Sequence, residues 1–194
     1  MADIQSKIFK YRNYTPVIFT GVFLLYRYPN IWSLLTGFVI VTAGLLLRIW
    51  GAGYNNTTNK SDGTEQKYFI ISGPFSYIRN PLYAGNILIY NGLGVMSFAL
   101  FPYLTLFTFT FFCLQYRFII KGEDVQLLKE YGKDFEKYKS SVAGLFPKLN
   151  AYKDDKISRA VFSFKSGIES ERKTIQAIGL MEVTLFVIWF IGRY

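Results

Sequence analysis

Four long apolar runs constrain this chain more than any other feature of its sequence. They occupy residues 31–50, 82–101, 103–120 and 175–191, and each approaches the roughly 20 helical residues that cross about 30 Å of hydrocarbon. Backbone in lipid must satisfy its hydrogen bonds internally, which a helix does. A fifth run, 14–26, is shorter, so it must use its flanking tyrosines as interfacial anchors or lie partly outside the hydrocarbon. The runs predict an all-α integral membrane protein with about five transmembrane helices.

The connections between these runs differ in length and in charge. Residues 27–30 and Pro102 are short turns that make two helical hairpins, whereas 51–81 and 121–174 are long. Thirteen Lys and Arg residues lie from Arg117 to Lys173, while the hairpin turns carry only Arg27. By the positive-inside rule, we expect the N-terminus and both long connections to face the cytosol and the C-terminus to lie outside.

Composition narrows the class of protein further. Apolar residues make up 51% of the 194 residues and charged residues only 18%, which is unlike an ordinary soluble domain and fits one membrane unit. The formal charge of +9 could indicate nucleic-acid binding, but Lys and Arg in such a chain more commonly gather in cytosolic loops. With no His and with Cys113 as its single cysteine, the sequence excludes disulfides, zinc-finger spacings and Cys/His nucleophile pairs. No small-residue cleavage site follows the N-terminus, so the first run is expected to be retained.

Residues 72–85 place an aromatic, cationic segment directly before an apolar run. Pro81 fits the first turn of a helix, whose N-terminal N–H groups lack intrahelical acceptors and carry partial positive charge. With Arg79 beside it, this corner can bind a carboxylate. The alternative is that Arg79, Tyr77 and Tyr83 only anchor the helix among the lipid headgroups. Arg48, at the end of an earlier run, is also expected to extend to the headgroups.

Residues 123–138 have the pattern of an amphipathic helix lying along the membrane surface. One face carries Asp124 and apolar residues at three- and four-residue steps, and lysines lie on the other face. Glu123 and Asp124 directly follow a predicted span, where the helix dipole disfavours negative charge unless a cation compensates. A sulfonium or an ammonium could be that cation. The alternative is an ordinary interfacial helix whose acids pair with Lys121 and Lys129.

Together, the two segments resemble the integral-membrane isoprenylcysteine carboxyl methyltransferase and phospholipid methyltransferase superfamily. That family carries an Arg-His-Pro or Arg-Asn-Pro box followed by Tyr, then a membrane hairpin, then two acids with Leu, an aromatic-Gly pair and a Tyr at fixed spacings. The upstream residues 47–53, LRIWGAG, are similar to its bacterial members, and the resemblance covers residues 46–147. This chain carries the boxes as Arg79-Asn80-Pro81-Leu82-Tyr83 and as Glu123-Asp124, Leu127, Tyr131-Gly132, Phe135 and Tyr138.

The resemblance implies a methyltransferase that uses S-adenosylmethionine and needs no metal. The acceptor it implies is lipophilic: an isoprenylcysteine-like carboxylate, a phospholipid, or another lipophilic amine or acid. It assigns catalytic roles to Glu123 and to Arg117, the latter because Ile119 stands where eukaryotic members carry a substrate-side arginine. A strand-like segment at 67–70 would line the mouth of the site. The cofactor-binding residues it implies are Lys67, Tyr68, Phe69, Ile70, Phe75, Arg79, Asn80, Pro81, Leu82, Tyr83, Glu123 and Asp124.

The chemistry of methyl transfer restricts the acceptor. Because the chain lacks histidine, an acceptor that must lose a proton would depend on Glu123, Asp124, a tyrosine or solvent. A carboxylate needs no base, so an acceptor that arrives as a nucleophile is favoured. We expect membrane lipids and a lipophilic or lipidated substrate as partners, no nucleic acid, and a site that faces the cytosol from the plasma (inner) membrane of a prokaryote.

The sequence leaves three hypotheses for the function of the protein. The first is a methyltransferase with its core at 1–150, an interfacial connection at 151–174 and an additional C-terminal transmembrane helix at 175–194. The second is an NADPH-dependent membrane reductase of the sterol-reductase type, which has a similar core. The third is a non-enzymatic membrane scaffold. Thermal stabilisation by S-adenosylhomocysteine, by NADPH or by neither separates the three.

Overall fold

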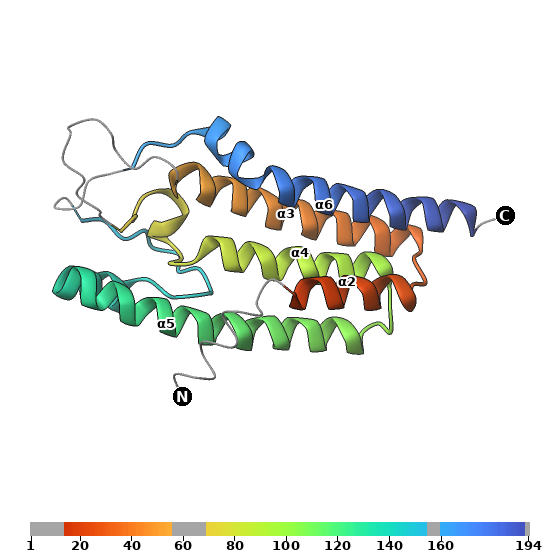
Figure 1. Cartoon of the computed structure of the whole chain (residues 1–194), viewed down its shortest axis with the longest axis horizontal. Coiled ribbons are helices and arrows are strands. Elements are labelled where there is room, and N and C mark those ends of the chain that lie inside the picture. The colour runs from red at the N-terminus through yellow and green to blue at the C-terminus, as the bar shows by residue number, and fades with distance from the viewer. Residues whose placement is uncertain (1–13, 56–68, 155–159, 193–194) are drawn as a thin grey trace.

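The computed structural model describes residues 14–55, 69–154 and 160–192, and within these ranges the protein is a helical bundle without a β-strand. The α-helices run along the long axis of the molecule (Figure 1). The all-α fold expected from the apolar runs is confirmed. The helices are α2 (Thr15–Leu25), α3 (Ile31–Asn55), α4 (Pro81–Ser97), α5 (Tyr103–Ser141) and α6 (Phe164–Ile191), with a 3-10 turn, η1 (Gly73–Ser76), before α4.

Helix length separates long spans from shorter elements. Among the described residues, α3, α5 and α6 are long and apolar enough to cross a membrane, so the chain is a membrane protein. Helix α4 has 17 residues and is about 26 Å long, because it ends at Ser97 instead of continuing to residue 101 as expected. Helix α2 has 11 residues and is about 17 Å long, roughly half the hydrocarbon thickness.

The two short turns lie together at one end of the bundle, as the hairpin pattern predicted. The backbone N–H of Tyr28 donates to the carbonyl of Ser97 at 2.9 Å, and the Ser33 hydroxyl donates to the carbonyl of Met96 at 3.2 Å. The C-terminal end of α6 lies at this same end (Figure 1), and the long connections lie at the other. The two predicted boxes therefore share the end opposite the short turns.

Glycines bring α3 and α4 into backbone contact. A Cβ atom on Gly44 would lie 2.7 Å from the carbonyl oxygen of Gly85, and one on Gly92 would lie 2.9 Å from that of Gly37. These distances leave no room for a side chain, and small residues that permit close approach are a common means of helix association in membranes. The α3/α4 pair is thus the tightly packed centre of the bundle.

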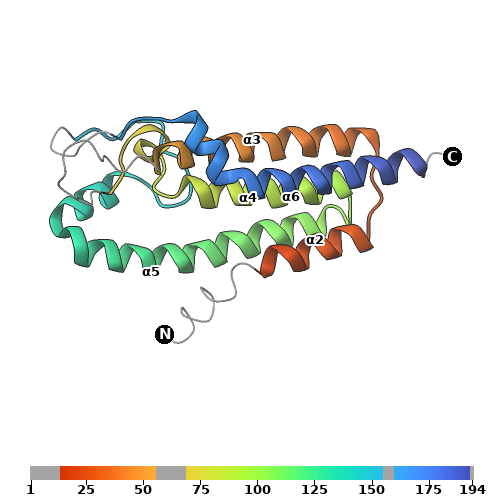
Figure 2. The same cartoon turned by 45° about the horizontal axis from the view of Figure 1, so that its top comes forward.

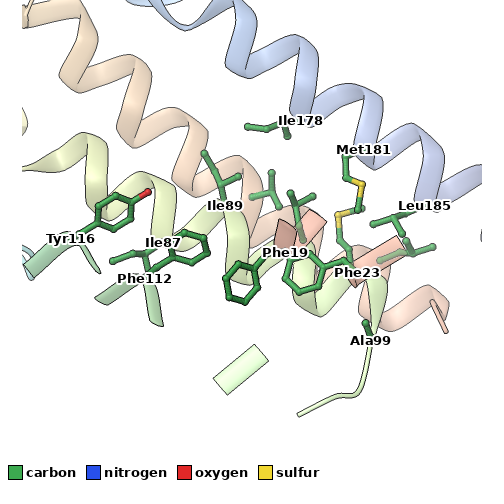
Figure 3. Close-up of a cluster of buried hydrophobic side chains, with 14 of the residues drawn as sticks. Phe19, Phe23, Ile87, Ile89, Ala99, Phe112, Tyr116, Ile178, Met181 and Leu185 are labelled. Atoms are coloured by element: carbon green, nitrogen blue, oxygen red, sulfur yellow. The ribbon is translucent and has the colours of Figure 1, made fainter. Parts of the chain in front are cut away.

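The main buried cluster draws side chains from α2, α3, α4, α5 and α6, and Figure 3 shows a part of it. The rings of Phe19 and Phe112 lie with centroids 5.1 Å apart, which joins α2 to α5. Phe23 and Leu185 have no exposed surface. Although α2 is short, it is therefore packed into the core rather than lying loosely on the surface.

Helix α5 does not end where the predicted span ends. It continues past residue 120 and changes direction at Gly132, whose φ of 55° and ψ of −127° are not helical. Figure 2 shows the chain turning back at this end of α5. The expectation that Glu123 and Asp124 follow a helix C-terminus is therefore wrong, because both lie inside a continuous helix. The expected face is confirmed, since Asp124 is buried and Lys129 is exposed.

Helix α6 begins at Phe164 rather than at residue 175. Its N-terminus is capped by Ser163, whose side chain accepts a hydrogen bond from the Ser166 N–H. A Cβ atom on Gly167 would lie 2.6 Å from the carbonyl oxygen of Ile49, so the first turns of α6 pack closely on α3. Residues 164–174, expected in an interfacial connection, are thus the start of a helix that lies against the bundle.

Candidate functional site

One cavity of about 1510 Å³ connects the predicted boxes with the interior of the bundle. Helices α2, α3, α4, α5 and α6 and residues 69–80 all contribute to its lining. Ten of the predicted cofactor residues line it, and the other two, Lys67 and Tyr68, lie outside the described residues. Phe69 and Ile70 have no regular secondary structure, so the strand expected there is absent from the described part of that segment. The ten lining residues are Phe69, Ile70, Phe75, Arg79, Asn80, Pro81, Leu82, Tyr83, Glu123 and Asp124.

Arg79 is held in place by a buried carboxylate and by backbone carbonyls. Its guanidinium lies 2.8 Å from Asp124, and each of the two side chains is only 9% exposed. It also donates to the carbonyls of Lys139 at 3.1 Å and Val142 at 2.6 Å. The Lys139 ammonium lies 3.4 Å from Asp124. Asp124 therefore orients Arg79, and it does not pair with Lys121 or Lys129 as the interfacial-helix alternative supposed.

The N-terminus of α4 lies at the cavity wall. Asn80 occupies the N-cap position, but no side chain caps the helix there. The Asn80 amide instead donates to the carbonyl of Gly144 at 2.9 Å. Since Pro81 and Leu82 line the cavity, the positive end of the α4 dipole is directed toward the space where a ligand would lie.

Residues 142–152 hold the first box against the end of α5. The Arg79 N–H donates to the carbonyl of Ala143 at 2.9 Å, and the Tyr152 N–H donates to that of Ser76 at 2.9 Å. The Tyr138 hydroxyl donates to the Phe75 carbonyl at 2.7 Å. A second apolar cluster supports this region. Tyr152 packs against this cluster outside the membrane spans, and its burial there, together with a hydrogen bond to Asp154, raises the pKa of Tyr152. The cluster consists of Phe69, Ile71, Phe135, Tyr138 and Val142, with Leu127, Leu128, Tyr131 and Tyr152 packed against it.

Glu123 is joined to α4 through a tyrosine. The Tyr83 hydroxyl donates to the Glu123 carboxylate at 2.5 Å, and the Tyr83 ring stacks on that of Tyr116 with centroids 4.8 Å apart. The Asn86 amide donates to the Tyr116 hydroxyl at 3.0 Å. These contacts join the first box (residues 79–83), the second box (residues 123–138) and the membrane-embedded part of α5.

Arg48 does not extend to the headgroups as expected. It points across the bundle and binds Glu171 of α6 in a bidentate arrangement, with Nε and one terminal nitrogen each donating at 2.8 Å. It also donates to the Asn86 side chain and, at 3.4 Å, to the Leu82 carbonyl. The Arg48 side chain is 14% exposed and that of Glu171 is 3% exposed. Arg48 lines the cavity, so this ion pair belongs to the site.

Arg117 is not brought to the cavity. It is exposed and does not line the cavity, whereas its neighbour Tyr116 is buried and does. Successive helical residues differ by about 100° in direction, and at this point of α5 that rotation turns Arg117 away from the cavity. Arg117 therefore lies outside the cavity that the ten described cofactor residues line, and Ile119 lies in the buried core.

Sequence reasoning missed several residues that line the site. Asn86, Tyr90 and Leu93 follow the predicted Leu82 at helical spacing along α4, and this repeat could have indicated the cavity face. The far part of the cavity is mostly apolar. Its lining includes Val17, Gly21, Ile89, Leu93, Ile178 and Met181.

Comparison with known proteins agrees with the geometry. Residues 32–134 match the phospholipid methyltransferase family (PEMT). The chain belongs to this family. The match ends before Phe135 and Tyr138 of the second box and does not include α6.

Two relatives carry names from metal resistance. The chain is 30% identical over 119 residues to the cobalt-zinc-cadmium resistance protein CzcN of Cupriavidus metallidurans, covering 61% of this chain and 51% of that protein. It is 32% identical over 126 residues to the nickel-cobalt-cadmium resistance protein NccN of Alcaligenes xylosoxydans xylosoxydans, covering 63% of this chain and 54% of that protein. The chain thus spans about half the length of these relatives. No solved structure matches it.

Proposed function

We propose that this phospholipid methyltransferase family member transfers a methyl group from S-adenosylmethionine to a lipophilic acceptor at the cytosolic face of the membrane. The observation that carries the proposal is a continuous cavity of about 1510 Å³, which joins charged residues at one end of the bundle to apolar residues within it. Pockets for one small molecule usually measure roughly 300–1,000 Å³. This cavity therefore has room for a cofactor and for part of a second, apolar molecule.

The residues at the polar end suit the groups of S-adenosylmethionine. Arg79 Nε is buried and has no hydrogen-bond partner among the described residues, although Arg79 lines the cavity. That nitrogen and the uncapped N-terminus of α4 would bind the cofactor's carboxylate. The Glu123 carboxylate would lie near the cationic part of the cofactor, and Phe69 and Phe75 offer aromatic surface to the adenine.

The cofactor would supply a methyl group on a sulfonium. In the transfer, the methyl carbon's bond to sulfur breaks as its bond to the acceptor's oxygen or nitrogen forms, and sulfur keeps the electron pair to give S-adenosylhomocysteine. A carboxylate acceptor needs no proton removed. An amine acceptor must lose one proton. Of the two carboxylates among the described residues that line the cavity, Asp124 is paired with Arg79, so Glu123 is the one that could accept the proton. The protein's main tasks are to align the two ligands and to exclude water.

The proposed orientation follows from charge. The described residues of the long connections lie at the same end of the bundle as the two boxes (Figure 1), and thirteen Lys and Arg residues lie from Arg117 to Lys173. Positive residues concentrate on the cytosolic side of membrane proteins. We therefore place the cofactor end of the cavity in the cytosol of a prokaryotic cell and the short turns on the far side of the plasma membrane.

The names of the relatives refer to metal resistance, and this chain offers a different chemistry. Within residues 14–55, 69–154 and 160–192, no group of three or more His, Cys, Asp or Glu side chains is placed to hold a metal ion. The cavity's polar end instead combines an arginine, a helix N-terminus and a carboxylate. This combination supports methyl transfer as the function of the site.

Ligand binding tests the proposal directly. Purified full-length protein in detergent should bind S-adenosylhomocysteine with a dissociation constant well below millimolar and should be thermally stabilised by it, but not by NADPH. Tyr83→Ala and Glu123→Ala should each weaken binding at least tenfold, because they remove the two ends of the 2.5 Å hydrogen bond at the cavity wall. Matched controls are Tyr103→Ala and Glu136→Ala, whose side chains are exposed away from the cavity.

Two results would contradict the proposal. Stabilisation by NADPH alone would indicate a reductase, and stabilisation by neither ligand would indicate a scaffold. A labelled-methyl assay on a membrane lipid extract, followed by mass spectrometry of the product, then identifies the acceptor.

A further inference from the structure

We infer that α6 completes the acceptor-binding half of the site: Glu171 positions Arg48, and Arg48 together with Tyr90 binds the polar end of the lipophilic acceptor. This inference rests on the proposed function and goes beyond it, since it names the residues that select the acceptor. It also assigns a role to a helix that lies outside the family match at residues 32–134.

Helix α6 forms a wall of the cavity through its middle turns, residues 173–181. Its lining residues begin near the polar end and continue into the bundle, which places α6 beside the space left by the cofactor. Subtracting the largest ordinary small-molecule pocket from the cavity volume leaves at least about 500 Å³ for another ligand. The α6 residues that line the cavity are Lys173, Thr174, Ala177, Ile178 and Met181.

The Arg48–Glu171 pair is arranged for a purpose other than stability. Buried ion pairs contribute little net stability, because the cost of removing both charges from water offsets their attraction. The Arg48 side chain passes α4 at Gly85, where the absence of a side chain makes room for it: a Cβ atom on Gly85 would lie 2.5 Å from Cγ of Arg48. Arg48 thereby crosses α4 and reaches the cavity with a fixed guanidinium, as recognition of a polar headgroup requires.

The hydrogen bonds that Arg48 forms among the described residues do not use all of its donors. A guanidinium has five N–H groups, and Arg48 donates two hydrogen bonds to Glu171, one to Asn86 and one to the Leu82 carbonyl. The fifth N–H is on the terminal nitrogen that lies 2.7 Å from the second Glu171 oxygen, and a ligand in the cavity could share it. Glu171 compensates the charge, so the ligand's polar end is bound through hydrogen bonds and does not need to carry a full negative charge.

Tyr90 offers a second polar contact beside Arg48. It lines the cavity and stacks on Phe112 with centroids 4.7 Å apart, and its hydroxyl forms no hydrogen bond among the described residues. It lies one helical turn beyond Asn86, whose side chain accepts a hydrogen bond from Arg48. A tyrosine hydroxyl inside a largely apolar cavity usually finds a partner, and the polar end of the acceptor would be that partner.

The hydrocarbon of the acceptor would extend from this point into the bundle. Ile89 and Leu93 of α4 face the same cavity as Ile178 and Met181 of α6. With the cofactor at the Arg79 end, the acceptor's polar end lies between the cofactor and the apolar lining. This order places the reacting atom near Tyr83 and Glu123 and the lipid tail away from water.

Two variants test the inference by separating acceptor binding from folding. Tyr90→Phe removes only the hydroxyl, and the double variant R48M/E171M removes both charges without leaving one unpaired. Each variant is assayed for binding of S-adenosylhomocysteine, for its thermal unfolding midpoint and for methyl transfer to a polar lipid extract dispersed in detergent. The matched controls are Tyr103→Phe and the double variant K137M/D154M, which removes an ion pair that does not line this cavity.

We expect the half-saturating lipid concentration to rise roughly three- to tenfold in Tyr90→Phe, the range of one lost hydrogen bond, and at least tenfold in R48M/E171M. Affinity for S-adenosylhomocysteine should change less than twofold in both. Unchanged lipid dependence with intact cofactor binding overturns the inference alone. If wild-type protein binds S-adenosylhomocysteine but transfers no methyl group to any lipid, the inference is also overturned. If wild-type protein does not bind S-adenosylhomocysteine, the proposed function is overturned as well.

Discussion

The buried pair of Arg79 and Asp124 allows a quantitative prediction for Asp124→Ala. The substitution removes a carboxylate 2.8 Å from a guanidinium, and both side chains are 91% shielded from solvent. Breaking such a pair typically costs about 3–5 kcal/mol, because the remaining charge stays buried. Arg79 keeps its bonds to the Lys139 and Val142 carbonyls, so the lower end, about 3 kcal/mol, is expected.

Part of this cost should appear as weaker cofactor binding. If the first box must be reordered before a ligand can bind, about 3 kcal/mol corresponds to a loss of roughly 150-fold in affinity. The Lys139 contact at 3.4 Å involves a 37% exposed side chain and adds little. We expect Asp124→Ala to lower the thermal unfolding midpoint in detergent and to weaken binding of S-adenosylhomocysteine between tenfold and 150-fold, both measured by thermal shift and calorimetry.

Glu136→Ala is the matched control, because Glu136 is an exposed carboxylate on the same helix. It should leave both quantities at their wild-type values. If Asp124→Ala behaves like Glu136→Ala, then Arg79 is not held by Asp124 in the way described, and the reasoning from the buried pair is refuted.

Two further predictions concern the bundle itself. Gly44→Val should lower the free energy of unfolding by about 1–3 kcal/mol through overpacking at the α3–α4 contact. The control Gly179→Val should not lower it, because no atom lies within 4 Å of the Cβ position of Gly179. Equal unfolding midpoints for the two variants would exclude close packing of α3 on α4. Gly132→Ala should cost about 1–2 kcal/mol, because φ is 55° although no atom lies within 4 Å. Differential scanning calorimetry measures this cost, and an unchanged midpoint would mean that α5 does not turn at Gly132.

The features that repeat along the sequence were predictable, and the contacts between distant residues were not. The apolar runs gave the three long helices and the hairpins, because membrane spans depend on local composition. The two boxes were expected to share one end, and in the structure eleven of their twelve residues line one cavity. The roles assigned to those residues, and the division into a core at 1–150, a connection and an added helix, remain predictions.

The errors have specific physical causes. Arg48 and Glu171 are 123 residues apart, and no local pattern shows that an arginine at a span end turns inward to a partner on α6. Arg117 and Tyr116 are neighbours in sequence but face opposite environments, which depends on the rotation of α5 about its axis. The turn at Gly132 replaced the expected break near residue 121, because residues 121–131 stay helical and the backbone leaves helical geometry only at Gly132, where φ is 55°.

Helix α5 is continuous between its membrane-embedded part and the polar end of the cavity. From Tyr103 to Tyr131 it is a straight element about 43 Å long, and it carries Gln115 and Tyr116 in the bundle and Glu123 and Asp124 at the polar end. Helices respond to bilayer thickness by tilting, and a tilt of roughly 5° about the end at the short turns displaces the other end of such a rod by about 4 Å. Any change in the tilt of α5 would therefore move Glu123 and Asp124 together with Gln115 and Tyr116, because one continuous helix carries all four residues.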